Sequence, residues 1–302
     1  MKISSASPSI TSKEIQFVNK AISDGWGNKM NYYINLFAKE FAKYIGVKYC
    51  LPVSHCTDAI HLALLSLNIK KGDEVLVPDL TWVASVAPIK YVGAKPIFVD
   101  IQKDTLCIDP LKIQKKITKR TKALISVNLF GNLADNKAIK KICKKNKIIL
   151  IEDSAESIGA KQNGVMAGTN GKISLFSFNA TKLIMSSQGG CLCTNNKKIY
   201  EKAKLFSHHG IDKNKTGKYY WSSLVGYNYN WTNIQAALGC AQLDSVDEII
   251  INKIRVYKRY LLNLEGKPGL RFQKITPACE PVMWAIAIRL DEAIACWRPV
   301  NS

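Results

Sequence analysis

The segment IILIEDSAES, residues 148–157, carries the pattern that decides the fold. Its apolar residues run without a polar interruption and end in two carboxylates, which is typical of a strand buried on both faces of a parallel sheet. It predicts a strand over Ile148–Glu152. Segments with helical periodicity alternate with further runs of this kind, which predicts an α/β fold in which helices flank a mostly parallel sheet. The other predicted strands are Glu74–Val77, Pro96–Val99, Ala123–Asn128, Ile173–Phe178 and Cys191–Thr194, and the helices between them are Thr57–Leu67, Thr81–Tyr91 and Ala134–Lys145.

Residues that leave the carboxyl ends of these strands are the first candidates for a binding site, because ligands of open α/β sheets bind at that edge. The second half of the chain has a different pattern, with longer helices and a polar, aromatic segment over residues 210–230 that predicts a functional loop. The strand-end groups are Asp79–Trp82, Asn128–Gly131, Glu152–Glu156 and Ser177–Lys182. The later elements are helices over Ile199–His209 and Thr232–Leu264, the second broken between Asp244 and Asp247, and strand-like pieces at Leu270–Phe272 and Met283–Leu290.

The chain has 302 residues and is strongly basic, with 43 Lys and Arg against 23 Asp and Glu, a formal net charge of +20. Its lysines are spread along helices, and few lie beside aromatic residues of the kind that stack on bases. This pattern favours a solvated basic surface without a nucleic-acid or membrane partner, and such a field also attracts a phosphorylated substrate. No apolar run is long enough to span a bilayer and the N-terminus has no secretory signal, so we expect a cytoplasmic protein.

The nine cysteines do not indicate a disulfide framework in a chain of this length. Cys191 and Cys193 are two residues apart and would share one face of a strand. Without a second pair or a nearby histidine, this spacing favours free buried thiols, and no metal site is predicted.

Three segments carry residues suited to chemistry. SHCTDAIHLAL, residues 54–64, predicts a helix start that can bind an anion or can simply be capped. Asp153 ends a strand, where a carboxylate can bind a metal, a ribose hydroxyl or a protonated ring nitrogen, or can cap the next helix. Lys182, in FSFNATKLIMSSQGG (176–190), follows another strand end and has apolar neighbours at 183–185. A lysine held among apolar groups loses its charge more easily and can become a Schiff-base nucleophile.

Together these features suit one cofactor, pyridoxal 5′-phosphate (PLP). The phosphate needs N–H donors and hydroxyls, which the helix start provides. The ring needs an aromatic face, for which Trp82 is placed after a strand. The pyridine nitrogen needs a carboxylate, and the aldehyde needs a lysine, which are supplied by Asp153 and Lys182.

The order and wording of these motifs resemble the DegT/DnrJ/EryC1/StrS sugar aminotransferases, which are fold-type I PLP enzymes. The resemblance runs from Gly25-Trp26 over nearly the whole chain, in PVSHCTDAIHLAL, GDEVLVPDLTWVAS, IEDSAESIGA, FSFNATK, SQGG and GYNYNWTNIQAALGCAQL. It implies a seven-stranded sheet in a PLP-binding large domain over residues 12–238. Residues 239–302 would belong to a smaller C-terminal α+β domain, which would be incomplete because the family pattern is lost after Met283-Trp284.

The resemblance also implies roles at the ring of PLP. Lys182 would attach the cofactor and then move the proton during catalysis. Asp153 would pair with the pyridine nitrogen, and Trp82 would stack on the ring. Glu156 stands where the family often has glutamine, near the 3′-oxygen of PLP.

At the phosphate, the resemblance assigns backbone N–H groups to Cys56, Thr57 and Asp58 and a hydroxyl to Ser177. Cys56 replaces the usual glycine, which is tolerable if that turn needs no positive φ. Asn228 matches an asparagine that reaches the PLP phosphate of the neighbouring subunit, which implies a homodimer with shared active sites.

The implied reaction moves an amino group from glutamate, which leaves as 2-oxoglutarate, to a nucleotide-linked 4-keto-6-deoxy sugar of the perosamine type, for O-antigen or another surface glycan. Three alternatives stay open: a sugar dehydratase that binds PLP, an aminotransferase for 3-keto sugars, and an inactive PLP-binding partner subunit. The dehydratases of the family carry histidine in place of the lysine, so Lys182 disfavours the first alternative.

Overall fold

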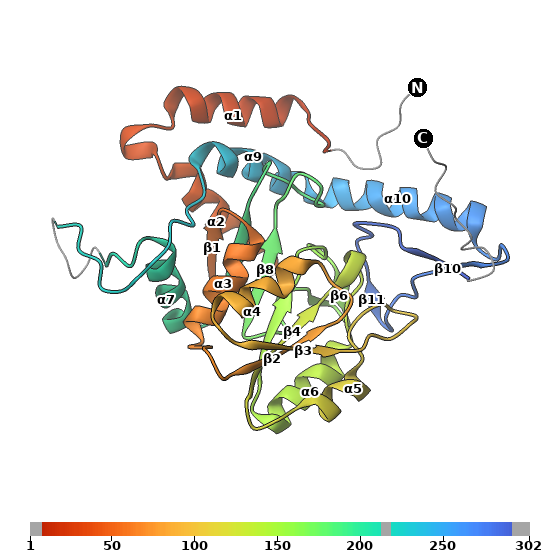
Figure 1. Cartoon of the computed structure of the whole chain (residues 1–302). Helices are drawn as coiled ribbons and strands as arrows, with labels where there is room; N and C mark the ends of the chain where they lie inside the picture. The colour runs from red at the N-terminus through yellow and green to blue at the C-terminus, as the bar shows by residue number, and fades with distance from the viewer. Residues whose placement is uncertain (1–7, 213–218, 292–302) are drawn as a thin grey trace, which may run out of the picture.

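The computed structural model describes residues 8–212 and 219–291 (Figure 1). A seven-stranded sheet forms its centre, in the strand order β1-β9-β8-β5-β4-β2-β3. Strand β9 pairs antiparallel with β1 and β8, and the other neighbours in the sheet pair in parallel. The predicted α/β class with a mostly parallel sheet is therefore confirmed. The strands are β1 (Tyr49–Val53), β2 (Glu74–Pro78), β3 (Lys95–Val99), β4 (Thr121–Val127), β5 (Ile149–Asp153), β8 (Ile173–Ser177) and β9 (Gly190–Thr194).

The six strands expected from apolar runs all form, with ends displaced by at most two residues. Strand β1 is not among the predicted strands. Its sequence YCLPV contains Pro52, which cannot donate a backbone hydrogen bond. Its place at the edge of the sheet, where it pairs with β9 alone, explains how the proline is tolerated.

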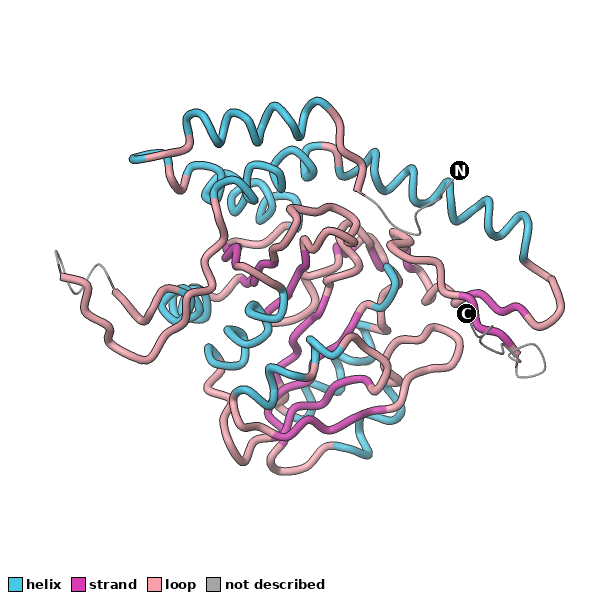
Figure 2. Tube along the Cα trace, turned by 45° about the horizontal axis from the view of Figure 1, so that its top comes forward, coloured by secondary structure: helices cyan, strands magenta, loops and turns pink. Residues whose placement is uncertain are grey.

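Helices cover both faces of the sheet, as Figures 1 and 2 show. One apolar cluster includes Leu62 and Ile139 from helices and Leu192 from β9. The other includes Phe37 and Phe176. The two clusters form the core of a three-layer α/β/α arrangement. The first is covered by α3 (Cys56–Ser66), α4 (Ala87–Tyr91), α5 (Pro110–Lys116), α6 (Asn136–Asn146) and α7 (Lys197–Ser207), and the second by α1 (Ser12–Asp24), α2 (Tyr32–Ile45) and α9 (Asn233–Asp244).

The helix expected over Thr81–Tyr91 is wrong as one element. The structure has a short 3₁₀ turn, η2 (Val83–Ser85), followed by α4, with Val86 between them. Pro88 accounts for the break, because a proline fits only the first turn of a helix and α4 therefore has to start beside it. Two further 3₁₀ turns are η1 (Gly27–Lys29) and η3 (Leu129–Gly131).

The long C-terminal helical segment breaks where the sequence predicted. Helix α9 starts at a capping box, in which Thr232 and Gln235 bond each other's backbone N–H groups. It ends at Asp244, and α10 (Val246–Leu264) follows after Ser245 alone. Helix α1 packs on α9 (Figure 1). The predicted domain boundary at residue 238 lies inside α9, whose Ala237 and Cys240 belong to one buried cluster.

The described C-terminal part contributes strands to two small sheets. Strand β10 (Leu270–Phe272) forms as predicted and pairs with β12 (Ile288–Leu290), so the strand expected over Met283–Leu290 is shorter than predicted. Just before that segment, the Val282 N–H donates a hydrogen bond to the Gly131 carbonyl at the end of η3. Within the described ranges, no helix has the length and apolar character needed to cross a membrane. The other small sheet consists of β6 (Lys161–Gln162), β7 (Val165–Met166) and β11 (Cys279–Glu280).

Candidate active site

A cavity of about 270 Å³ lies at the carboxyl-terminal edge of the sheet. The parallel strands β4, β5 and β8 contribute Val127, Asp153 and Ser177 from their last residues. The start of α3 and the start of the antiparallel β9 close it at one side. The prediction of a site at the carboxyl ends of the strands is supported by this placement. Its lining includes Cys56, Thr57, Trp82, Ser85, Asp153, Glu156, Ser177, Lys182 and Trp284.

The start of α3 forms an end of the cavity suited to an anion. Helix α3 begins at Cys56 with no side-chain cap, so its first N–H groups are available to a ligand. Gly190 makes room for them: a Cβ atom there would lie 2.3 Å from the Cys56 backbone nitrogen. The side chain of Asp58 accepts a hydrogen bond of 2.6 Å from Ser54 Oγ, so its contribution to an anion would be its N–H group.

Cys56 stands in this turn without strain. It is absent from the described residues with positive φ, so the side chain in place of the family's glycine is accommodated, as expected. Burial raises the pKa of the Cys56 thiol well above its usual value, and the nearby Asp153 carboxylate adds to this effect. The side chain is therefore a neutral thiol beside the anion site.

Asp153 is the buried carboxylate of the cavity. Its Oδ2 accepts a 2.8 Å hydrogen bond from Ser85 Oγ, and its Oδ1 accepts one of 3.1 Å from the Ala155 N–H. Burial raises the pKa of the Asp153 carboxyl above its usual value, against the opposing effect of the Ser85 hydroxyl. A positively charged ligand group beside this carboxylate would offset the cost of its burial.

The neighbouring Glu152 points the other way, because successive side chains on a strand face opposite sides. Its Oε1 accepts a 2.9 Å hydrogen bond from Asn128 Nδ2, and its Oε2 accepts one of 2.9 Å from the Asn170 N–H. Glu152 therefore holds two loops in place, and Asp153 alone of this pair faces the cavity.

Lys182 lies in the turn that follows β8. Its Nζ is 3.0 Å from Glu156 Oε1 and 4.0 Å from the ring centroid of Trp284. The expectation that its amine sits among apolar groups is wrong, because the apolar neighbours at 183–185 are themselves buried in the core while the amine faces a carboxylate and an indole. Glu156 is fixed in turn by the Phe130 N–H, which donates to Oε2 at 2.7 Å.

Trp82 and Ser177 also line the cavity, as predicted. Asn228, which the resemblance assigns to the neighbouring subunit's site, does not line the cavity of its own chain. Trp82 precedes η2 and is 73% exposed, so one face of its indole is open to a ligand ring. Ser177 is buried at the end of β8. Asn228 lies beside His208 in an isolated bridge, and its Oδ1 accepts a hydrogen bond from Asn230.

Ser85 and Trp284 line the cavity although the sequence analysis did not predict them. Ser85 sits one 3₁₀ turn after Trp82, and a break in the expected helix was needed to aim its hydroxyl at Asp153. Trp284 comes from the C-terminal segment, where it stacks on Phe130 and its Nε1–H donates to the Thr181 carbonyl at 2.7 Å. The contacts of Trp284 are with residues distant in the sequence, so no local pattern could reveal them.

The chain is similar in sequence to known proteins of one family. Members of the DegT/DnrJ/EryC1/StrS aminotransferase family match the chain over residues 8–298. The chain is 42% identical over 259 residues to GDP-perosamine synthase of Escherichia coli O157:H7, an alignment that covers 86% of this chain and 70% of that protein. It is 38% identical over 285 residues to GDP-perosamine synthase of Vibrio cholerae, which covers 94% and 77%.

Solved structures agree in fold. The aminotransferase TlmJ from Streptoalloteichus hindustanus superimposes with a TM-score of 0.91 at 25% identity, over 97% of this chain and 80% of that one. GDP-4-keto-6-deoxymannose-3-dehydratase with a trapped PLP-glutamate geminal diamine gives 0.89 at 28% identity, over 96% and 80%. The sequence match, the shared fold and the placement of Lys182 and Asp153 lead to one conclusion: this chain belongs to the DegT/DnrJ/EryC1/StrS aminotransferase family.

Proposed function

We propose that this chain is a PLP-dependent aminotransferase that moves an amino group from glutamate to a nucleotide-linked 4-keto-6-deoxy sugar of the perosamine type. The observation that carries the proposal is the cavity in which an amine, a buried carboxylate and an uncapped helix start converge. The names of the relatives support the choice of sugar. The aminated sugar would then enter a surface glycan such as an O-antigen.

The residues present fit PLP at both of its ends. The free N–H groups of Cys56, Thr57 and Asp58 would receive the phosphate, with the Ser177 hydroxyl at the same side. Gly190 supports this fit, because any side chain there would fill the cradle. Net positive charge favours the approach of the phosphate and of the nucleotide sugar.

The residues around the ring have separate tasks. When bound, PLP would supply an aldehyde for the Lys182 amine and a ring that accepts electrons as a Cα–H bond of the donor breaks. Asp153 would hold a proton on the ring nitrogen, and Ser85 fixes the direction of that carboxylate. Trp82 would cover one face of the ring.

Lys182 would move the protons. Its Nζ would accept the proton that leaves Cα of glutamate, and in the second half of the reaction it would deliver a proton to C4 of the sugar. Glu156 holds the amine at 3.0 Å, and the Trp284 ring lies over it at 4.0 Å, which would limit the access of water.

A spectrum and a labelling experiment test this function. Added PLP should give the purified chain an absorption band near the visible edge, and glutamate should shift that band. With nitrogen-labelled glutamate and GDP-4-keto-6-deoxymannose, mass spectrometry should then find the label in the sugar. A sugar that loses a hydroxyl without gaining the label would indicate a dehydratase instead. A band that ignores glutamate would indicate an inactive PLP-binding subunit, and the absence of any band would contradict PLP binding itself.

We further propose a homodimer in which Asn228 reaches the PLP phosphate of the neighbouring subunit. Two observations support this. Asn228 lies outside the cavity of its own chain. The loop that precedes it exposes Tyr219, Tyr220 and Trp221 by 73–83%, which is typical of residues that a partner covers.

Mixing two inactive variants tests the shared site. Lys182→Arg and Asn228→Ala subunits should each be weakly active or inactive alone. After exchange, half of the dimers are mixed and each has one intact site, so activity should return to about a quarter of the wild-type value. Lys182→Arg mixed with Asp153→Asn is the matched control, because both changes lie in the same subunit's half of the site and no intact site can form. Equal recovery in both mixtures, or none in either, would contradict the shared site.

A further inference from the structure

Three buried thiols meet on one face of the central sheet, away from the active-site cavity. Cys50 of β1 lies opposite Cys193 of β9 in the antiparallel register, and Cys191 is two residues from Cys193 on the same face. The three Sγ atoms all lie within 4.8 Å of one another, and the Cys191 and Cys193 sulfurs are 3.7 Å apart. The exposed fractions are 4%, 0% and 0% for Cys50, Cys191 and Cys193.

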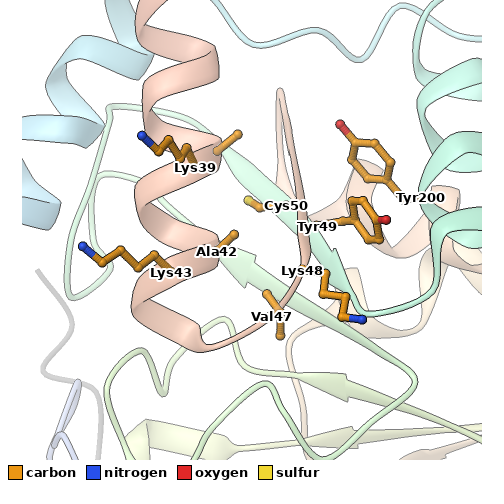
Figure 3. Close-up of a pocket in the computed structure, with 9 residues that line it drawn as sticks. Lys39, Ala42, Lys43, Val47, Lys48, Tyr49, Cys50 and Tyr200 are labelled. Carbon is orange, nitrogen blue, oxygen red and sulfur yellow. The ribbon is translucent and has the colours of Figure 1, made fainter.

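The surroundings of the three thiols are apolar, and a cavity borders one of them. Their strand face packs against α2 in the apolar cluster that contains Phe37 and Phe41. Cys50 also lines a separate cavity of about 420 Å³ between α2 and the edge strand β1. Figure 3 shows its sulfur between that helix and the stacked rings of Tyr49 and Tyr200, whose centroids are 4.9 Å apart. Of the three thiols, Cys50 is the one that lines this cavity, so a water molecule there could approach its sulfur.

The spacing of the sulfurs fits a metal with thiolate ligands. In a tetrahedral zinc site the Zn–S bonds are about 2.3 Å long, which places neighbouring sulfurs about 3.8 Å apart. The Cys191–Cys193 separation of 3.7 Å matches this value, and the Cys50 sulfur lies within 4.8 Å of both. Soft thiolates select zinc or monovalent copper over the hard cations.

We propose that Cys50, Cys191 and Cys193 form a zinc site, with a water from the cavity beside Cys50 as the fourth ligand. On binding, each thiol releases one proton to solvent, so three Zn–S bonds replace three S–H bonds and no redox change occurs.

The charge of the site favours zinc over copper. Three thiolates with Zn²⁺ have a net charge of −1, whereas three thiolates with monovalent copper have a net charge of −2. Buried charge is costly, so the divalent ion is favoured. The surrounding surface is basic, with Lys39, Lys43 and Lys48 along the same cavity.

The position of the site indicates what the metal would do. It would join the edge strand β1 to β9, and both strands lead directly to the anion end of the active site. The chain leaves β1 at Val53 and enters α3 at Cys56, while Gly190 at the start of β9 packs against the Cys56 backbone. Zinc would therefore hold the edge of the sheet and the start of α3 in a fixed relation, without touching substrate.

Zinc titration of the full-length chain tests the proposal independently of activity. The reduced protein is stripped of metal with a chelator and titrated with Zn²⁺ without oxygen, in competition with a chromophoric indicator. One Zn²⁺ should bind per chain and should raise the melting temperature, because it binds the folded state. Cd²⁺ in place of Zn²⁺ should give an ultraviolet thiolate-to-metal band.

The variant Cys193→Ser should lose the cadmium band and weaken zinc binding by more than about 100-fold. Loss of a residue that only supports a metal ligand weakens binding by at most about 100-fold, so a larger effect identifies Cys193 as a ligand. Cys143→Ser is the matched control, because Cys143 is an equally buried thiol in the other apolar cluster, and this variant should bind zinc like the wild type. If Cys193→Ser does not fold, the cadmium band and stoichiometry of the wild type still decide the outcome. No tight Zn²⁺ in the reduced wild type, binding that survives Cys193→Ser, or a Cys50–Cys193 disulfide found by thiol counting and mass spectrometry would each overturn the proposal.

Discussion

The variant Lys182→Arg should show no transamination above background, a loss of at least about 1,000-fold in turnover. Arginine keeps a cation opposite Glu156, so the ion pair that holds residue 182 is preserved. Its guanidinium, however, cannot lose a proton in a protein and cannot bond covalently to an aldehyde. Both tasks proposed for Lys182 therefore fail together, while the charge of the site is unchanged.

The measurement is transfer of labelled nitrogen from glutamate to the sugar by the purified variant, with wild type and Lys198→Arg in parallel. Lys198 is exposed on α7 and does not line the cavity, so its replacement should leave turnover unchanged. The variant at 182 should keep the melting temperature of the cofactor-free wild type within a few degrees, since it keeps the contact with Glu156. Turnover by Lys182→Arg within tenfold of wild type would remove this lysine from the chemistry.

The sequence predicted the central strands and pointed to Asp153 and Lys182, because the strands and the residues at their ends are encoded locally. A run such as Ile148–Ile151 can only be buried on both sides, and the residues at its end have to face the ligand edge of the sheet. Period-2 alternation could also have separated Asp153 from Glu152, but the strand's register is needed to know which of them faces the cavity. Only the fold supplies that register.

The parts that the sequence did not predict depend on contacts between distant segments. Trp284 meets Lys182 because the C-terminal segment packs on η3, and Ser85 meets Asp153 because two short helical pieces replace one. The same limit applies to the thiols. Cys191 and Cys193 alone indicate buried core residues, and the third sulfur enters only because the unexpected edge strand β1 places Cys50 opposite Cys193.

Replacing Asp153 with asparagine should lower turnover on the order of 100-fold or more, the scale of losing one group that stabilises developing charge in a closed site. Asparagine has nearly the same shape and can still accept a hydrogen bond from Ser85, so the cavity should persist. It carries no negative charge, so it cannot hold a proton on the ring nitrogen of PLP.

The variant Ser85→Ala leaves the carboxylate but removes its hydroxyl partner, so it should lower turnover less than Asp153→Asn does. It should also shift the pH profile of turnover, because the pKa of Asp153 would rise further.

The replacement of Asp153 with asparagine should also stabilise the cofactor-free protein at neutral pH. Burial raises the pKa of Asp153 in the folded chain above the ordinary value of about 3.9 that it has when unfolded. Between those two values the unfolded chain has already lost the proton that the folded chain retains, so wild-type stability falls as the pH rises. Asparagine has no proton to lose, so Asp153→Asn should melt at a higher temperature than wild type at pH 7, and the difference should shrink as the pH is lowered toward 4.

Added PLP should reverse the order of the two melting temperatures, because its protonated ring nitrogen would pair with Asp153 in the wild type alone. Melting curves at several pH values, with and without PLP, measure both effects. A cofactor-free variant less stable than wild type at pH 7 would show that Asp153 stabilises the fold itself, and its burial could then not be explained by the cofactor.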